Sequence, residues 1–347
     1  MTLNSSLMAR PIISVIIPTY NRGEYLGRTL SSVFKTGYES LEVIVIDDES
    51  TDNTGAVVEP YINEGLIQYL RILNDGMCGP ASAINAGLRL ASGELIHCLD
   101  ADDCVLPSYY EEVLHVFNSD PRVDAVSAFA SVIDSEDRVM GKYVYPDYST
   151  PHEFRVKSLL GNQVISSSMI VKRSCYDVVG GRRPELQICC DYDLWLRVGE
   201  RFNVHLIREV LVSYRRHESN ISSSTEQMAQ YDRSIVADYV HRNTVEFFIP
   251  ENVQRDRRAA AQYLSALAAL LECRGFYELM VPFLLGAIAR SPRDSDLYAA
   301  LGSSYYAQGV FTKARFYIER ALRLNGENKK ASSLLGLLME PLSSNPG

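Results

Sequence analysis

Residues 93–103 read GELIHCLDADD, a short apolar run that ends abruptly in carboxylates. The run from Glu94 to Leu99 predicts a strand that is buried on both faces, with Asp100, Asp102 and Asp103 directly after it. Carboxylates that cluster after a buried strand repel one another and lose solvation, so they persist most readily where a cation binds them. The alternative is a solvated loop that caps the helix expected near Pro107.

Outward from this run, the chain alternates between strand patterns and helix patterns. Strands are predicted at 12–17, 41–46, 67–73 and 94–99, and helices at 25–34, from residue 54 onward and at 80–91. This β-α-β-α-β-α-β order implies an α/β domain with a mostly parallel sheet between helices. Ligands gather at the carboxyl ends of such strands. Three of the four strands run directly into polar residues there, at 19–21, 47–48 and 100–103.

The second half of the chain changes from mixed structure to helices. Shorter strands are expected at Ser168–Lys172 and Val204–Ile207, and a boundary at Ser222–Ser224. Beyond it, similar residues recur 34 positions apart, in the pairs Leu267 and Leu301, Gly275 and Gly309, and Ala287 and Ala321. This period is typical of tetratricopeptide repeats, although an ordinary helical hairpin is the alternative. We therefore expect an α/β domain at 11–222, a helical linker at 223–260 and an all-α tetratricopeptide-like module at 261–340.

The composition argues against several classes of protein. The 347 residues carry a formal net charge of -9, whereas nucleic-acid binders usually present a basic face, so no nucleic-acid partner is expected. Seven cysteines without a C-x-x-C pair favour a reducing cytoplasm over a zinc site or a disulfide framework. No stretch reads as a transmembrane segment. Work at a membrane would therefore be peripheral, at its inner face.

In order and spacing, the motifs of residues 11–222 resemble the family 2 glycosyltransferases of the GT-A fold. The matching segments are SVIIPTYN (14–21), EVIVIDDESTD (42–52), NAG (85–87), ASGELI (91–96), LDADD (99–103), VGG (179–181), DYDLWLR (191–197) and YRRH (214–217). The resemblance implies an inverting, metal-dependent glycosyltransferase of the hexosyltransferase type. Such an enzyme moves a sugar from a nucleotide-diphosphate donor, with a UDP-sugar favoured, to a hydroxyl acceptor such as another sugar. Polysaccharide or glycoconjugate synthesis is the default role.

The resemblance also implies which residues bind the nucleotide. Pro18 and Tyr20 match the turn that lies against the base and the ribose. Asp48 matches the acid that accepts a hydrogen bond from the base, which suits uracil or thymine and also the N1–H and N2 edge of guanine. Asp100 and Ala101 match positions beside the ribose.

The remaining matched residues are expected to bind the metal, to lie near the donor phosphates or to act as the catalytic base. Asp102 and His217 match the ligands of a divalent metal, with Mn or Mg as the expected cofactor. Asp103, Arg215 and Arg216 are expected near the donor phosphates, where arginine makes charge-assisted hydrogen bonds. Asp191 matches the catalytic base. The alternative is that Asp191 only caps a helix and that His217 is structural.

Two residues depart from the family pattern, and two other functions are alternatives. Ile84 replaces a frequent arginine, which removes a phosphate contact, and Cys190 replaces a frequent glutamate, which alters acceptor binding. A second hypothesis is a catalytically silent scaffold that binds a nucleotide sugar and presents the repeats to a protein partner or to a second copy. A nucleotidyltransferase is a third, but residues 19–23 make a poor phosphate loop.

Overall fold

The computed structural model describes residues 12–73, 80–143, 148–218, 220 and 225–339. The chain divides into two compact units, Met1–Asp232 and Arg233–Gly347, and the division falls within helix α8 (Thr225–Arg242). The boundary expected at Ser222–Ser224 lies outside the described residues.

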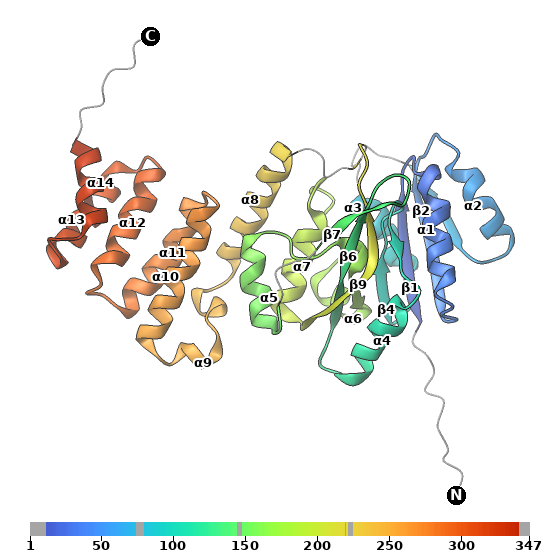
Figure 1. Ribbon diagram of the computed structural model, residues 1–347, viewed down its shortest axis with the longest axis horizontal. Coiled ribbons are helices and arrows are strands. Elements are labelled where there is room, and N and C mark those ends of the chain that lie inside the picture. The colour runs from blue at the N-terminus through green and yellow to red at the C-terminus, as the bar shows by residue number, and fades with distance from the viewer. Residues whose placement is uncertain (1–11, 74–79, 144–147, 219, 221–224, 340–347) are drawn as a thin grey trace, which may run out of the picture. The chain divides into compact units, whose positions relative to one another are not determined.

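The first unit is built on a sheet whose strand order, within the described residues, is β3-β2-β1-β4-β8-β6-β9-β5, with β7 paired to β6 (Figure 1). The strands are β1 (Ile13–Thr19), β2 (Leu41–Asp48), β3 (Gln68–Ile72), β4 (Leu95–Cys98), β5 (Cys104–Val105), β6 (Ala125–Ile133), β7 (Val139–Tyr143), β8 (Ile170–Lys172) and β9 (Val204–Arg215). The predicted parallel arrangement is confirmed for β3, β2, β1 and β4. The other half of the sheet is mixed, because β8 runs antiparallel to β4 and β6 while β9 runs parallel to β6.

Alternate residues of β1 enter two separate cores, which is why every residue of this strand is buried. Ile13, Val15 and Ile17 pack with one set of helices, and Ile16 packs with another set on the opposite face. The first set is α1 (Gly23–Lys35), α2 (Thr54–Asn63) and α4 (Tyr109–Ser119), and the second is α3 (Pro80–Leu90), α5 (Pro151–Lys157), α6 (Arg173–Val179) and α7 (Cys190–Arg201). The sheet therefore lies between helices, as the sequence predicted.

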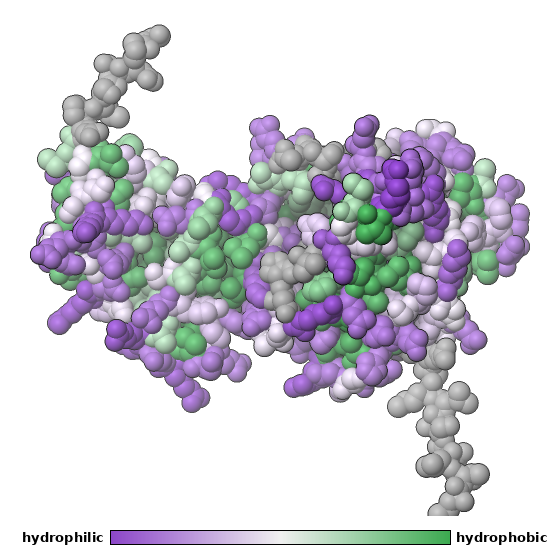
Figure 2. All heavy atoms as spheres, in the orientation of Figure 1, coloured by the Kyte–Doolittle hydropathy of each residue, from purple (hydrophilic) through white to green (hydrophobic). Residues whose placement is uncertain are grey.

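The second unit is helical throughout its described residues. After the short helices η4 (Val245–Phe248) and α9 (Glu251–Gln254) come α10 (Arg257–Cys273), α11 (Tyr277–Arg290), α12 (Ser295–Ala307), α13 (Phe311–Leu324) and α14 (Lys329–Met339). Gly275 and Gly309 lie in the turns after α10 and α12, with φ angles of +71° and +73° that favour glycine. Apolar side chains also reach the surface of this unit, as the green area over α10 and α11 in Figure 2 shows. Among the described residues, no helix has both the length and the apolarity that crossing a membrane requires.

Candidate active site

The acidic motif lies in the turn between β4 and β5, at the carboxyl edge of the sheet. The backbone N–H of Asp103 donates to the carbonyl of Asp100 (3.1 Å), and the backbone N–H of Asp100 donates to the Ser167 hydroxyl (3.1 Å). The hydroxyl of Thr29, on α1, lies 2.8 Å from the carbonyl oxygens of both Ala101 and Asp103. The turn is therefore fixed both by Thr29 of α1 and by Ser167.

Asp102 and His217 form a contact between residues that are 115 positions apart. Asp102 Oδ2 lies 2.9 Å from His217 Nε2, and the imidazole ring stacks on Tyr25 at a centroid distance of 4.9 Å. Arg22 Nε lies 3.4 Å from the same carboxylate oxygen. Asp102 therefore already contacts a histidine and a cationic side chain.

A divalent cation fits this pair, because an oxygen and an imidazole nitrogen are suitable donors and Mg²⁺ is usually held by one or two protein ligands plus substrate phosphates. Within the described part of the chain, no three His, Cys, Asp or Glu side chains converge on one point. Asp102 and His217 would thus supply two ligands, and the donor diphosphate would supply others.

Asp103 is fully buried and differs from Asp102 in its environment. One carboxylate oxygen accepts the backbone N–H of Arg215 (2.8 Å), and the other has no hydrogen-bond partner among the described residues. Burial, together with the charges of Asp102 and Asp100, raises the pKa of Asp103 well above its usual range. Asp103 thus lies beneath the turn rather than at its surface.

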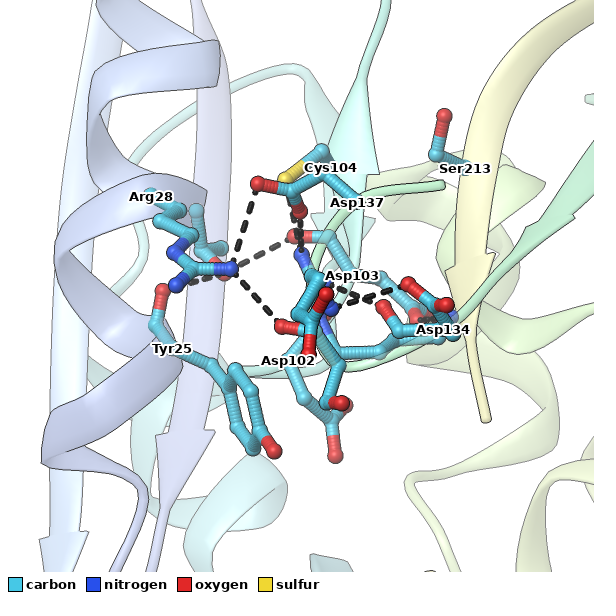
Figure 3. Close-up of polar contacts among 12 residues, drawn as sticks. Tyr25, Arg28, Asp102, Asp103, Cys104, Asp134, Asp137 and Ser213 are labelled. Atoms are coloured by element: carbon cyan, nitrogen blue, oxygen red, sulfur yellow. Dashed lines mark hydrogen bonds and ion pairs between the residues drawn. The ribbon is translucent and has the colours of Figure 1, made fainter. Parts of the chain in front are cut away.

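Arg215 is also fully buried, and its guanidinium binds the protein itself. It donates to the backbone oxygens of Asp102 (2.8 Å) and Asp134 (2.7 Å) and pairs with Asp137 (2.6 Å). Arg28, on α1, also pairs with Asp137 (3.1 Å). The contacts drawn in Figure 3 therefore connect the turn after β6, which contains Asp134 and Asp137, with the acidic motif. Arg216 is exposed, and its backbone N–H donates to the carbonyl of Ile133 (2.8 Å).

The residues expected to bind the nucleotide lie at the ends of β1 and β2. The parallel register pairs Thr19 with Asp47 and so brings Tyr20 and Asp48 to one edge of the sheet. Tyr20 is 53% exposed, whereas Pro18 is buried and Asp48 is nearly so. Both carboxylate oxygens of Asp47 already accept hydrogen bonds within the protein, from the Tyr69 hydroxyl and the Ser50 backbone N–H.

Asp191 lies in the first turn of α7, and its carboxylate accepts a hydrogen bond from Asn162 (2.8 Å). The N-cap of this helix is Cys189, without a capping side-chain bond, so Asp191 does not cap α7. Asp193 is fully buried and pairs with Arg183 and Arg197. The two acids of this motif therefore have different surroundings.

Arg182 links the two acidic parts of the site and was not singled out in the sequence. It is 4% exposed, and its guanidinium donates to the Ser166 hydroxyl (2.5 Å) and to the Cys190 sulfur (3.8 Å). Burial raises the pKa of Asp100 to about 6; the charges of Asp102 and Asp191 act in the same direction, and Arg182 opposes them. Asp191 and the acidic turn are thus close enough to interact electrostatically.

Comparison with solved structures identifies the fold. The chain aligns with S. aureus TarS 1–349 in complex with UDP-GlcNAc at a TM-score of 0.60 and 19% identity, over 92% of this chain and 93% of that one. It also aligns with the mannosyltransferase PcManGT from Pyrobaculum calidifontis, in complex with GDP-Man and Mn²⁺, at a TM-score of 0.54 and 20% identity, over 93% and 89%. The first unit has the GT-A fold of nucleotide-diphospho-sugar transferases.

Sequence comparison shows what the first unit is similar to. Residues 14–179 match the model of glycosyl transferase family 2. An uncharacterized glycosyltransferase of Rickettsia prowazekii is 25% identical over 77% of this chain and 81% of the relative. Another from Rickettsia felis is 26% identical over 69% of this chain, but the match spans only 40% of that relative.

Proposed function

We propose that the first unit transfers a sugar from a nucleotide-diphosphate donor, with UDP-sugars favoured, to a hydroxyl acceptor and with inversion at the anomeric carbon. One observation carries the proposal. The Asp102–His217 pair and Asp191 come from different elements, yet buried Arg182 connects their surroundings. It donates to Ser166, next to the Ser167 that binds Asp100, and to Cys190, next to Asp191. A displacement between a departing diphosphate and an arriving hydroxyl requires a cation site and a base that are near each other but separate.

On the donor side, Asp102 and His217 would hold Mn²⁺ or Mg²⁺, which when bound neutralises the diphosphate and stabilises it as a leaving group. Arg22, 3.4 Å from Asp102, and the exposed Arg216 are the cations best placed for phosphate oxygens. Arg215, fully buried, supports the acidic turn instead. The Mn²⁺ and GDP-Man bound by PcManGT support the choice of metal, and the UDP-GlcNAc bound by TarS supports the choice of nucleotide.

The nucleotide would lie along the ends of β1 and β2. The exposed Tyr20 ring offers a face for stacking, and Asp48 offers a carboxylate that accepts the imide N–H of uracil. Asp100 and Ala101 would flank the ribose. These assignments follow the order of the motifs along the sheet edge.

On the acceptor side, Asp191 would act as the base. The acceptor oxygen forms a bond to the anomeric carbon while the bond from that carbon to the diphosphate breaks. The hydroxyl proton passes to the carboxylate of Asp191. The nucleoside diphosphate leaves, so one displacement inverts the configuration.

Asp191→Asn tests this assignment. A positioned base contributes about a hundred- to ten-thousand-fold to the rate, so nucleoside diphosphate release from the donor that a panel of nucleotide sugars identifies should fall by that factor. Donor affinity should stay at the wild-type value, because no donor contact is assigned to Asp191. Transfer at the wild-type rate by Asp191→Asn would remove Asp191 from this role.

We also propose that residues 261–340 are tetratricopeptide-like repeats that bind a protein partner or a second copy, with residues 223–260 as a helical linker. Two glycine turns 34 residues apart support the repeat, and the exposed Phe311 (49%) and Phe316 (58%) support a binding role. Glycoconjugate synthesis is the role proposed for the whole chain. A silent scaffold has no need for the acids clustered at the sheet edge.

A further inference from the structure

The side chain of Asn162 is oriented by its own backbone. Asn162 lies between the short helices η1 (Ser158–Leu160) and η2 (Ser166–Ser168), and its Oδ1 accepts the backbone N–H of Val164 (3.1 Å). An amide has one acceptor oxygen and one donor NH₂ group. Because the oxygen faces a backbone donor, the NH₂ group faces Asp191, and Nδ2 lies 2.8 Å from Asp191 Oδ2.

The loop that carries Asn162 is itself held in place. The Gln163 side chain donates to the carbonyls of Lys157 (3.0 Å) and Gly161 (2.8 Å), and Val164 is buried. The hydroxyl of Tyr192, the neighbour of Asp191, donates to the carbonyl of Ser158. The loop and the start of α7 therefore form one fixed unit, and a fixed amide can impose a direction on the carboxylate beside it.

We infer that Asn162 is a positioning residue for Asp191, an inference that rests on the proposed function. Its N–H occupies one oxygen of the carboxylate, and no hydrogen bond from the described residues reaches the other oxygen, Oδ1. Oδ1 is then the atom that receives the acceptor proton. In this proposal Asn162 acts on the reaction only through Asp191.

Two substitutions at Asn162 separate this role from an ordinary loop role. Asn162→Asp keeps an oxygen for the Val164 N–H, but it removes the donor and places a second carboxylate beside Asp191. Asn162→Ala removes both bonds.

A misplacement of the Asp191 carboxylate by about 1 Å costs roughly a hundred-fold in rate, so we expect kcat to fall by about ten- to a hundred-fold in both variants. The donor KM and the UDP Kd measured with Mn²⁺ should remain at their wild-type values. If the role is only to hold the loop, Asn162→Asp keeps the wild-type kcat and only Asn162→Ala is impaired.

The double variant Asn162→Asp with Asp191→Asn completes the test. Positioning through Asp191 predicts that Asn162→Asp adds no further loss once Asp191 is already replaced, because residues that act as one unit are not additive. An additional ten-fold loss in the double variant would overturn the inference. A wild-type rate for Asp191→Asn refutes the base, whereas a slow Asp191→Asn beside a wild-type kcat for Asn162→Asp refutes only the role of Asn162.

Discussion

At the scale of single residues, His97 is a buried neutral histidine directly beneath the acidic turn. Its Nδ1 lies 3.1 Å from the Tyr110 hydroxyl, and its Nε2 lies 2.9 Å from the carbonyl oxygen of Ser167. The hydroxyl of the same Ser167 accepts the backbone N–H of Asp100. Burial lowers the pKa of His97 from 6.5 to about 4, although the bond to Ser167 opposes this shift.

This shift predicts how stability depends on pH. The unfolded chain binds a proton at His97 below about pH 6.5, whereas the folded protein does so only near pH 4. The stabilisation is therefore fully present above pH 6.5 and is lost progressively as the pH falls toward 4, by up to about 1.4 kcal/mol per pH unit. Urea unfolding of wild type and His97→Gln from pH 7 to pH 4.5 checks this. The variant should show the shallower slope, and equal slopes would contradict the assignment.

The sequence predicted most residues that lie together at the candidate site, but not Asn162 or Arg182. Asp100, Asp102, Asp191 and His217 follow strand ends or matched motifs, which spacing can reveal. Asn162 does not, because a side-chain bond across 29 positions links it to Asp191. Arg182 directly follows the matched VGG motif (179–181). Its burial depends on tertiary packing, which the periodicity of the sequence does not reveal.

At the scale of elements, the strands and helices of the first half were predictable, and the later strands were less so. β9 extends to Arg215, whereas the apolar pattern ended at Ile207, because Arg208 and Glu209 are exposed there. The pairing of β6 with β9 shifts register between Ala128 and Ala130, so the strand continues past an irregularity. Such a bulge interrupts the alternation on which sequence patterns depend.

The contact between α12 and α13 gives a prediction at this scale. A Cβ added at Gly302 would lie 2.6 Å from Ile318 Cγ1 and 3.3 Å from the carbonyl oxygen of Ala314. Overpacking of this kind costs about 1–3 kcal/mol, which exceeds the gain of roughly 0.5–1 kcal/mol from replacing a helical glycine. Gly302→Ala should therefore lower the midpoint of thermal unfolding of the helical unit.

Gly336, 34 residues later and on α14, is the matched control. Nothing lies within 4 Å of a Cβ added there, so Gly336→Ala should leave stability unchanged or raise it by up to about 1 kcal/mol. Equal effects of the two substitutions would mean that Gly302 is not a close-packing position.

At the scale of the whole molecule, the negative charge of the protein opposes the binding of a negatively charged diphosphate. The chain carries a net charge of -9, and three aspartates follow β4, where a diphosphate is proposed to bind. Arg22, near Asp102, offsets one negative charge, and Arg215 is enclosed by protein atoms. A bound cation would reverse this local field, so nucleotide binding should require one.

Calorimetric titration of UDP and GDP into the full chain tests this claim most directly, because it needs no knowledge of the sugar or the acceptor. We expect one of the two nucleotides to bind in Mn²⁺ and to lose most of its affinity in EDTA. Asp102→Ala, with its folding checked by thermal unfolding, should bind that nucleotide weakly and equally in both buffers. Binding by the wild type that is equally tight in EDTA, or no binding of either nucleotide in Mn²⁺, would contradict the account.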